Sequence, residues 1–237
     1  MESQKLANKN IFMTCEWKDL IISTYDVQKS ILEHYLPPNT ELDLYEGKAL
    51  MSIVAFTFAK VNFFGIKIPC HQKFGQINFR FYAKSKLDGT KGVVFIKEFA
   101  PKPLIALTAN LGYNEPYFYK NIKMAISSSG EQKSIKYSYK NKYISAEVSC
   151  NKESLKPETL EEFVVDRYVA FVKNHHSQTL QYKIHHRPWK IYKTIHSEIN
   201  ERIRFLLPEK FKKMNLLKTY VVDGSSVSVE KGILKPE

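Results

Sequence analysis

Four polar side chains alternate with apolar ones in the segment 75–83, and they are the foremost candidates for chemistry in this chain. The segment reads Gly-Gln-Ile-Asn-Phe-Arg-Phe-Tyr-Ala. Alternate side chains of an extended strand point to opposite faces. One face therefore carries Gln76, Asn78, Arg80 and Tyr82, and the other carries Ile77, Phe79, Phe81 and Ala83. Two amides, a guanidinium and a phenol in a row can bind a small polar or anionic molecule. A half-exposed strand whose polar side faces water is the alternative.

Two carboxylates downstream are candidates for acid–base chemistry. Glu98 lies in the segment Val-Val-Phe-Ile-Lys-Glu-Phe, on the same expected strand face as Val94 and Ile96. A carboxylate on an apolar face either reaches water at the strand end or is buried beside a partner. Glu115 lies in Tyr113-Asn114-Glu115-Pro116-Tyr117, a turn whose mixture is typical of pocket linings. Tyrosines beside a proline also commonly cover the end of a barrel. The expected ligand-binding residues are Gln76, Asn78, Arg80, Tyr82, Tyr113 and Tyr117, with Glu98 and Glu115 as the catalytic candidates.

The two arginines near these segments need partners if they are buried. An unpaired buried guanidinium is costly, so we expect a buried carboxylate beside Arg80 in the empty protein. Glu98 is the first candidate, because its strand should pair with 76–83, and Glu115 is the second. Arg167 lies beside an apolar stripe, and we expect it either to extend to the surface or to pair inward.

Metal, phosphate and nucleophile motifs were not found in the sequence. The pairs His175-His176 and His185-His186 could each offer only one ligand from a strand, and no His-Glu-x-x-His pattern accompanies them. His186-Arg187-Pro188-Trp189 better fits a packing turn with Trp189 buried. Gly-x-Ser-x-Gly, the P-loop and Gly-x-Gly-x-x-Gly are absent. We therefore expect no metal and no cofactor.

Charge and cysteine content bear on partners and location. The net charge of +12 is compatible with nucleic-acid binding, but only five of the 36 basic residues are arginine, and the lysines are scattered. Three widely spaced cysteines, without a CxxC pair, fit a reducing cytoplasm. The start lacks an apolar stretch, and the apolar run 49–59 is too short to span a bilayer. We expect a cytoplasmic protein with no membrane or nucleic-acid partner, and a homo-oligomer stays open.

Strands dominate the elements that must position these groups. The expected strands are 42–48, 49–58, 76–83 with its hairpin partner 92–99, 135–140, 142–149, 179–184, 190–195, and 220–229 with an Asp223-Gly224 turn. The expected helices lie within 17–35 after an Asp26 cap, at 104–111, at 159–173 behind a Thr159–Glu162 capping box, and at 197–207. This is one α+β domain dominated by antiparallel sheet.

An ordered set of short motifs resembles one known family. The motifs are Trp17-Lys18-Asp19-Leu20, Leu36-Pro37-Pro38, Gly47-Lys48-Ala49, Gln76 to Tyr82, Gly92 to Glu98, Tyr113 to Tyr117, Glu162-Phe163 with Asp166-Arg167-Tyr168, and His186-x-Pro188-Trp189. The chain resembles the YqjF-like family of uncharacterised bacterial proteins, in the acetoacetate decarboxylase-like superfamily. The resemblance covers roughly residues 17–229. We expect one single domain, 1–237, in which residues 1–10 form a flexible start. It implies a curved antiparallel sheet closing into a cone-like β-barrel, with helices packed outside and a pocket inside.

The resemblance implies less about chemistry. Acetoacetate decarboxylases use a Schiff-base lysine directly after a proline, with a neighbouring lysine that lowers its pKa. In the corresponding segment, 112–119, Pro116 is followed by Tyr117 and Phe118, and Lys102 has no adjacent lysine. We therefore do not transfer that mechanism. The leading hypothesis is a barrel that binds a small anionic or carbonyl-bearing organic molecule through Arg80. The alternatives are a decarboxylase- or lyase-like enzyme with a carboxylate acid/base and no Schiff base, and, ranked last, a nucleic-acid-binding protein.

Overall fold

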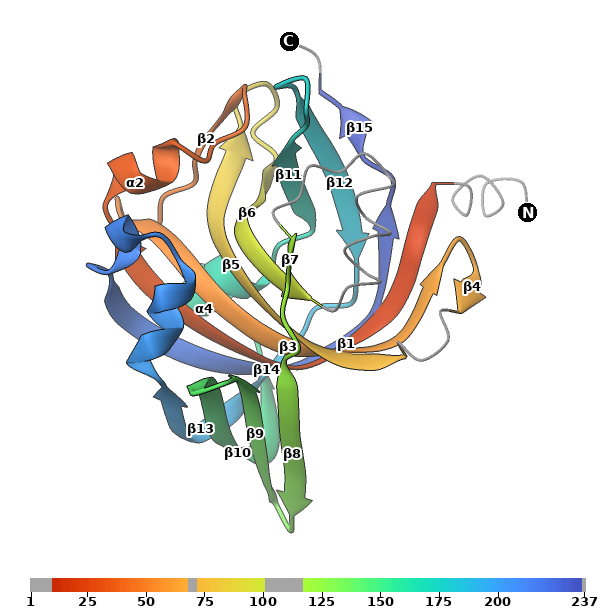
Figure 1. The fold of residues 1–237 in the computed structure, drawn as a ribbon, viewed down its shortest axis with the longest axis vertical. Coiled ribbons are helices and arrows are strands. Elements are labelled where there is room, and N and C mark those ends of the chain that lie inside the picture. The colour runs from red at the N-terminus through yellow and green to blue at the C-terminus, as the bar shows by residue number, and fades with distance from the viewer. Residues whose placement is uncertain (1–9, 68–71, 101–116, 236–237) are drawn as a thin grey trace.

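Strands make up most of the computed structural model, which describes residues 10–67, 72–100 and 117–235 (Figure 1). The strands are β1 (Ile11–Val27), β2 (Thr40–Leu42), β3 (Ala49–Phe63), β4 (Ile66–Lys67), β5 (Lys73–Ser85), β6 (Lys91–Ala100), β7 (Tyr117–Tyr119), β8 (Lys123–Ser129), β9 (Gln132–Tyr139), β10 (Lys142–Ser154), β11 (Val169–Lys173), β12 (Thr179–His185), β13 (Lys190–Ile199), β14 (Asn215–Glu230) and β15 (Ile233–Leu234). The helices are α2 (Lys29–Glu33) and α4 (Leu160–Val165), with 3-10 helices η1 (Glu201–Leu206) and η2 (Glu209–Phe211).

One part of the sheet closes on itself. Neighbouring strands follow the order β12–β11–β6–β5–β3–β1–β14, and β14 pairs again with β12. The order also continues from β14 through β13, β10 and β9 to β8, and these strands form the lower part of Figure 1. Most neighbours are antiparallel, while β6 pairs with β11 in parallel. The described residues therefore form a ring of strands with a four-stranded extension.

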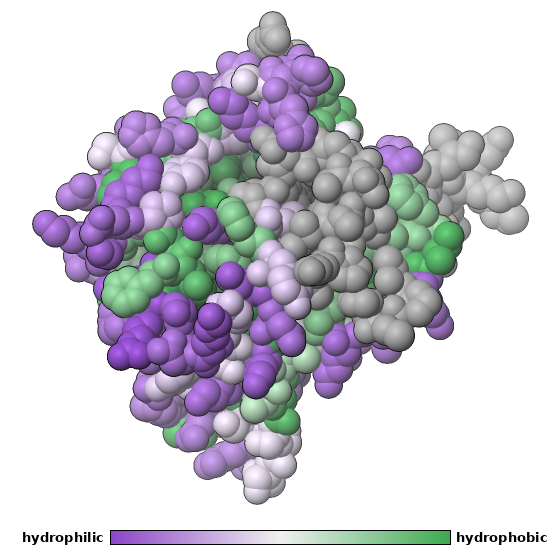
Figure 2. All heavy atoms as spheres, in the orientation of Figure 1, coloured by the Kyte–Doolittle hydropathy of each residue, from purple (hydrophilic) through white to green (hydrophobic). Residues whose placement is uncertain are grey.

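Apolar side chains cover both faces of the ring and build two cores. On one face, Ile77, Phe79 and Phe81 of β5 pack in a cluster that includes Leu32 of α2 and Phe211 of η2. The cluster on the other face contains aromatic residues of β3 together with Trp189 and residues of α4. The short helices thus lie on different faces of the sheet. In Figure 2, hydrophobic side chains gather beside α2, and hydrophilic ones surround them on the visible face.

The helix predicted after an Asp26 cap is confirmed in part. Lys29–Glu33 are helical, but the cap is Gln28, and the residues before it, 11–27, form the long strand β1, which the sequence did not predict. Leu20 and Ile22 contribute to one core, while Ile21 and Tyr25 contribute to the other. Because a strand buried on both faces shows no alternation, its apolar pattern cannot be distinguished from that of a buried helix.

The predicted helix 159–173 is correct only in its first turn. The Thr159 hydroxyl accepts from the Glu162 amide at 3.3 Å, as a capping box requires, but the Glu162 carboxylate accepts from the Glu158 amide instead. The helix ends at Val165, and 169–173 pairs with β6 and β12. Sheet pairing therefore overrides the helical pattern. The expected helix 197–207 is likewise the end of β13 followed by the 3-10 turn η1.

The predicted turn at Asp223-Gly224 is also wrong. Strand β14 continues through these residues, and Gly224 lies opposite Lys18 of β1. Gly224 has φ +76°, and a Cβ there would lie 2.0 Å from the Trp17 carbonyl oxygen. The glycine therefore permits a left-handed residue and a close approach of two strands. The predicted hairpin of 76–83 with 92–99 is confirmed, and the predicted helix 104–111 lies outside the described residues.

Among the described helices, none has the length and apolar character needed to cross a membrane.

Candidate functional site

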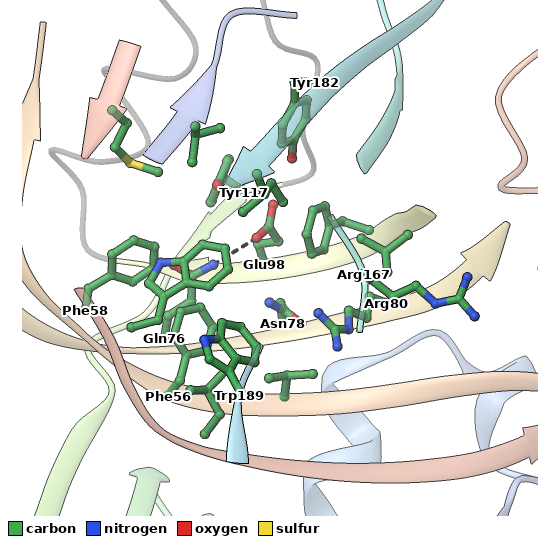
Figure 3. A pocket seen from close by; sticks show the side chains of 18 of the residues that line it. Phe56, Phe58, Gln76, Asn78, Arg80, Glu98, Tyr117, Arg167, Tyr182 and Trp189 are labelled. Carbon is green, nitrogen blue, oxygen red and sulfur yellow. Dashed lines mark hydrogen bonds between the residues drawn. The ribbon is translucent and has the colours of Figure 1, made fainter. Parts of the chain in front are cut away.

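The inner face of the ring encloses a cavity of about 60 Å³, lined partly by the polar face of β5 (Figure 3). Gln76, Asn78 and Arg80 line it together with mostly apolar side chains. The other lining residues are Phe12, Met13, Trp17, Leu20, Val54, Phe56, Phe58, Val93, Phe95, Glu98, Tyr117, Arg167, Tyr182, Ile184, Trp189 and Val229. Since one water needs about 10–15 Å³, this volume admits a group of a few non-hydrogen atoms.

The structure confirms that alternate side chains of β5 lie on opposite faces of the sheet. Gln76, Asn78 and Arg80 line the cavity, and Ile77 and Phe79 lie in the opposite core. Tyr82 shares the polar face but is not among the residues that line the cavity. The hydroxyl groups of Tyr82 and Ser52 are hydrogen-bonded at 2.6 Å. The role of Tyr82 as a ligand-binding residue stays a prediction.

A β-bulge brings Glu98 into the cavity. In the pairing of β5 with β6, Phe79 lies opposite Lys97, but Arg80 lies opposite Phe95, so Ile96 is the extra residue. The expectation that Glu98 shares a face with Ile96 is therefore wrong. Ile96 belongs to the outer core, whereas Glu98 lines the cavity with Phe95. Bulges commonly redirect a side chain in this way beside functional sites.

Gln76 and Glu98 form a buried hydrogen bond across the two strands. Gln76 Nε2 donates to Glu98 Oε1 at 2.8 Å, and the residues are only 1% and 3% exposed. While Glu98 is ionised, its carboxylate accepts but cannot donate, and the bond then fixes the orientation of the Gln76 amide. Gln76 Oε1 and Asn78 Oδ1 are buried without a hydrogen-bond partner in the described part of the chain. The cavity wall therefore presents acceptors that nothing described satisfies.

Arg80 is anchored by a main-chain carbonyl. One terminal nitrogen, Nη2, donates to the Val164 carbonyl of α4 at 3.0 Å, and Arg80 is 7% exposed. This carbonyl belongs to the last turn of α4, where main-chain acceptors lack helical partners. Within the described residues Arg80 forms no ion pair, and its Nε has no hydrogen-bond partner. The prediction that Glu98 is its ionic partner is therefore wrong, and Glu115 lies outside the described residues.

Arg167 pairs inward, as one of its two predicted arrangements required. Its Nη1 donates to Asp43 Oδ2 at 2.7 Å, and its Nε donates to the Phe163 carbonyl at 2.7 Å. The guanidinium carbon lies 4.2 Å from the centre of the Phe163 ring. Both charged side chains of the ion pair are at least nine-tenths buried. Arg80 and Arg167 thus donate to successive carbonyls at the end of α4. The sequence did not identify Asp43 as the partner of Arg167.

His186 and Trp189 form the packing turn that the sequence predicted. The His186 ring stacks between Tyr168 and Trp189, with centroid distances of 4.5 and 4.1 Å. Trp189 is 3% exposed, lines the cavity, and donates from Nε1 to the Ser225 hydroxyl at 3.0 Å. Burial lowers the pKa of His186. Within the described ranges, no group of three or more His, Cys, Asp or Glu side chains is arranged so that it could hold a metal ion.

Lysine is not represented among the described residues that line the cavity. The ammonium group of Lys97 donates to the Leu206 carbonyl at 3.0 Å, on the opposite side of β6. Tyr117 lines the cavity as expected, whereas Tyr113, Glu115 and Lys102 lie outside the described residues. Sequence reasoning missed most of the aromatic lining. Trp17, Phe56 and Phe58 come from strands whose apolar runs carried no alternation, whereas Tyr182 comes from the alternating strand β12.

The fold is similar to that of acetoacetate decarboxylase-like proteins. Acetoacetate decarboxylase from Legionella pneumophila superposes with a TM-score of 0.63 at 12% identity, over 95% of this chain and 87% of that chain. An acetoacetate decarboxylase-like enzyme from Sphingomonas wittichii RW1 gives 0.63 at 10% identity, over 96% and 94%. The enduracididine biosynthesis enzyme MppR, solved in complex with pyruvate, gives 0.61 at 11% identity, over 94% and 90%. Identities this low establish the shared fold alone.

Comparison of the sequence with known families identifies the family of this chain. The model of the DUF2071 family, described as an uncharacterized conserved protein, matches residues 14–210, and the chain belongs to this family. It is 27% identical over 205 residues to the uncharacterized protein YqjF of Bacillus subtilis strain 168, covering 79% of this chain and 81% of that protein. The resemblance stated from the motifs is therefore confirmed.

Proposed function

We propose that this protein binds a small organic molecule with a carboxylate or carbonyl group in the cavity beside β5, and that Arg80 is the anchor. The ring of strands would serve as the wall of a cone-like barrel around that cavity. The observation that carries the proposal is the buried Arg80 guanidinium, which has no carboxylate partner and an unpartnered Nε within the described residues. A ligand oxygen would satisfy that donor.

The surroundings of Arg80 favour an anion or a carbonyl over a neutral apolar ligand. A buried cation without a counter-charge is costly, and a carboxylate beside it removes much of that cost. Aromatic walls exclude water, which strengthens a charge-assisted hydrogen bond. Apolar lining with a few convergent polar groups is also the usual composition of a small-molecule site. The complex of MppR with pyruvate is an example of a small carboxylate bound to a protein of this fold.

A decarboxylase- or lyase-like activity is the second candidate, because the Glu98 carboxylate lies in the cavity wall. In that case Glu98 would be the acid/base and Arg80 would hold the substrate. No Schiff base is part of this candidate, since lysine does not occur among the described lining residues. The cytoplasm stays our expected location, on the evidence of three widely spaced cysteines.

Isothermal titration of a panel of two- to five-carbon carboxylates tests the proposal. We expect at least one to bind, and Arg80→Lys to weaken that binding about tenfold, because a point charge cannot replace the planar guanidinium fork. Arg202→Lys on the exposed side of η1 is the matched control, and its affinity should equal that of the parent. Equal affinities of the parent and Arg80→Lys would overturn the assignment of Arg80.

A further inference from the structure

The Gln76 amide can discriminate between ligands by the direction of a hydrogen bond. Its nitrogen donates to the buried Glu98 carboxylate, so its oxygen is the atom left for the cavity. That oxygen is buried and has no partner among the described residues. While Glu98 is ionised, rotating the amide would place its oxygen against a carboxylate oxygen, which is repulsive. The Gln76–Glu98 pair thus presents an acceptor, where an isolated glutamine could present either group.

Asn78 lies between Gln76 and Arg80 on the same strand face, and its Oδ1 is also buried without a partner in the described part of the chain. No hydrogen bond among the described residues fixes its amide, so Asn78 can turn either its oxygen or its nitrogen toward a ligand. Along the inner face of β5, the order is therefore a fixed acceptor, an adaptable amide and the cation Arg80. A ligand oxygen bound to Arg80 satisfies the cation, but it leaves the Gln76 oxygen without a donor. Leaving a buried acceptor unsatisfied weakens binding of that ligand.

We infer that the cavity selects a carboxylate that also carries a hydroxyl donor, and that it prefers a hydroxy acid to the corresponding oxo acid. The inference rests on the proposed function, because Arg80 must first hold the carboxylate. The ligand hydroxyl would donate to Gln76 Oε1, whereas a ketone oxygen would face an acceptor at the same place. One hydrogen bond of this kind corresponds to about tenfold in affinity, or 1.4 kcal/mol.

The distance between the groups determines the choice of probes. Gln76 and Arg80 are four residues apart on one strand, which is about 13 Å between Cα atoms, and both side chains must reach toward one ligand. Two chain lengths are therefore needed. Lactate and pyruvate form the short pair, and 4-hydroxyvalerate and levulinate form the longer pair. Within each pair the charge and the carbon skeleton are the same, so the affinity ratio reports the hydroxyl alone.

Titration of the parent protein with both pairs tests the inference. We expect the hydroxy acid to bind about tenfold more tightly than the oxo acid in at least one pair. In Gln76→Met the ratio should fall to about one, because the acceptor is removed at similar side-chain volume. In Glu98→Gln the new amide can donate to Gln76, so Gln76 can turn its nitrogen into the cavity, and the ratio should fall or invert.

A matched control separates this effect from charge and from folding. Glu33→Gln removes the same charge from the exposed end of α2 and should keep the parent ratio. Equal binding of both members of each pair to the parent would overturn the inference and leave the Arg80 anchor intact. Failure of all four probes to bind would overturn the inference together with the proposed function for small carboxylates. Thermal melts of each variant confirm that a changed ratio comes from folded protein.

Discussion

Replacing Asp43 by asparagine should destabilise this protein through Arg167. Asp43 and Arg167 form an ion pair in which both side chains are at least nine-tenths buried. Removing one charge from such a pair leaves the other uncompensated, which typically costs 3–5 kcal/mol. Asparagine has the same shape and can still accept, and Arg167 keeps its bond to the Phe163 carbonyl. We therefore expect the lower end of that range, about 3 kcal/mol.

This loss of stability can be measured as a fall in the melting temperature, Tm. A chain of 237 residues has an unfolding entropy of about 0.5 kcal/mol per kelvin near its midpoint. A loss of about 3 kcal/mol then lowers Tm by about 6 °C, which calorimetry or circular dichroism resolves easily. Asp88→Asn is the control, because Asp88 pairs with Lys235 at the surface, where ion pairs contribute little.

The result that would refute the reasoning is a Tm of Asp43→Asn within about 2 °C of the parent. Arg167 would then be stabilised mainly by its stacking on Phe163 and by the main chain. A second readout concerns ligand binding. Because Arg80 and Arg167 bind neighbouring carbonyls of α4, loosening Arg167 should also weaken carboxylate binding. Arg80→Lys should instead weaken binding with little change in Tm.

Three further predictions concern the remaining features. Borohydride reduction in the presence of pyruvate should leave the intact mass unchanged, because Tyr117 follows Pro116 where the decarboxylases have lysine; a reduced adduct on any lysine would contradict this. Burial lowers the pKa of His186 below its ordinary value of 6.5, so the unfolded state binds the proton more readily and stability should fall as pH drops below about 6.5. Urea titrations at pH 7.5 and 5.5 should show a smaller loss in His186→Phe than in the parent. Gly224→Ala should lower Tm by several degrees because of the clash with Trp17 and φ +76°, whereas Gly130→Ala, at φ +56° with open space around it, should cost less.

The site could be predicted from sequence where one strand face differed chemically from the other. The alternation of 76–81 correctly assigned Gln76, Asn78 and Arg80 to one face and the phenylalanines to the other. Strand β1 offered no such contrast, because both of its faces are buried, and the sequence did not predict it. Asp43 could not be connected with Arg167 because the two are 124 residues apart and no local pattern links them.

The bulge at Ile96 explains why the chemistry of the site was harder to predict than its location. Without the extra residue, Glu98 would follow Val94 and Ile96 into the outer core, where a carboxylate has no polar partner. With it, Glu98 meets the Gln76 amide and determines which of its two atoms faces the cavity. Residues 93–96 are apolar on both faces, so the sequence contains no alternation that a bulge would visibly interrupt. A one-residue irregularity in the sheet thus places in the wall beside Arg80 the carboxylate on which our inferred preference for hydroxy acids rests.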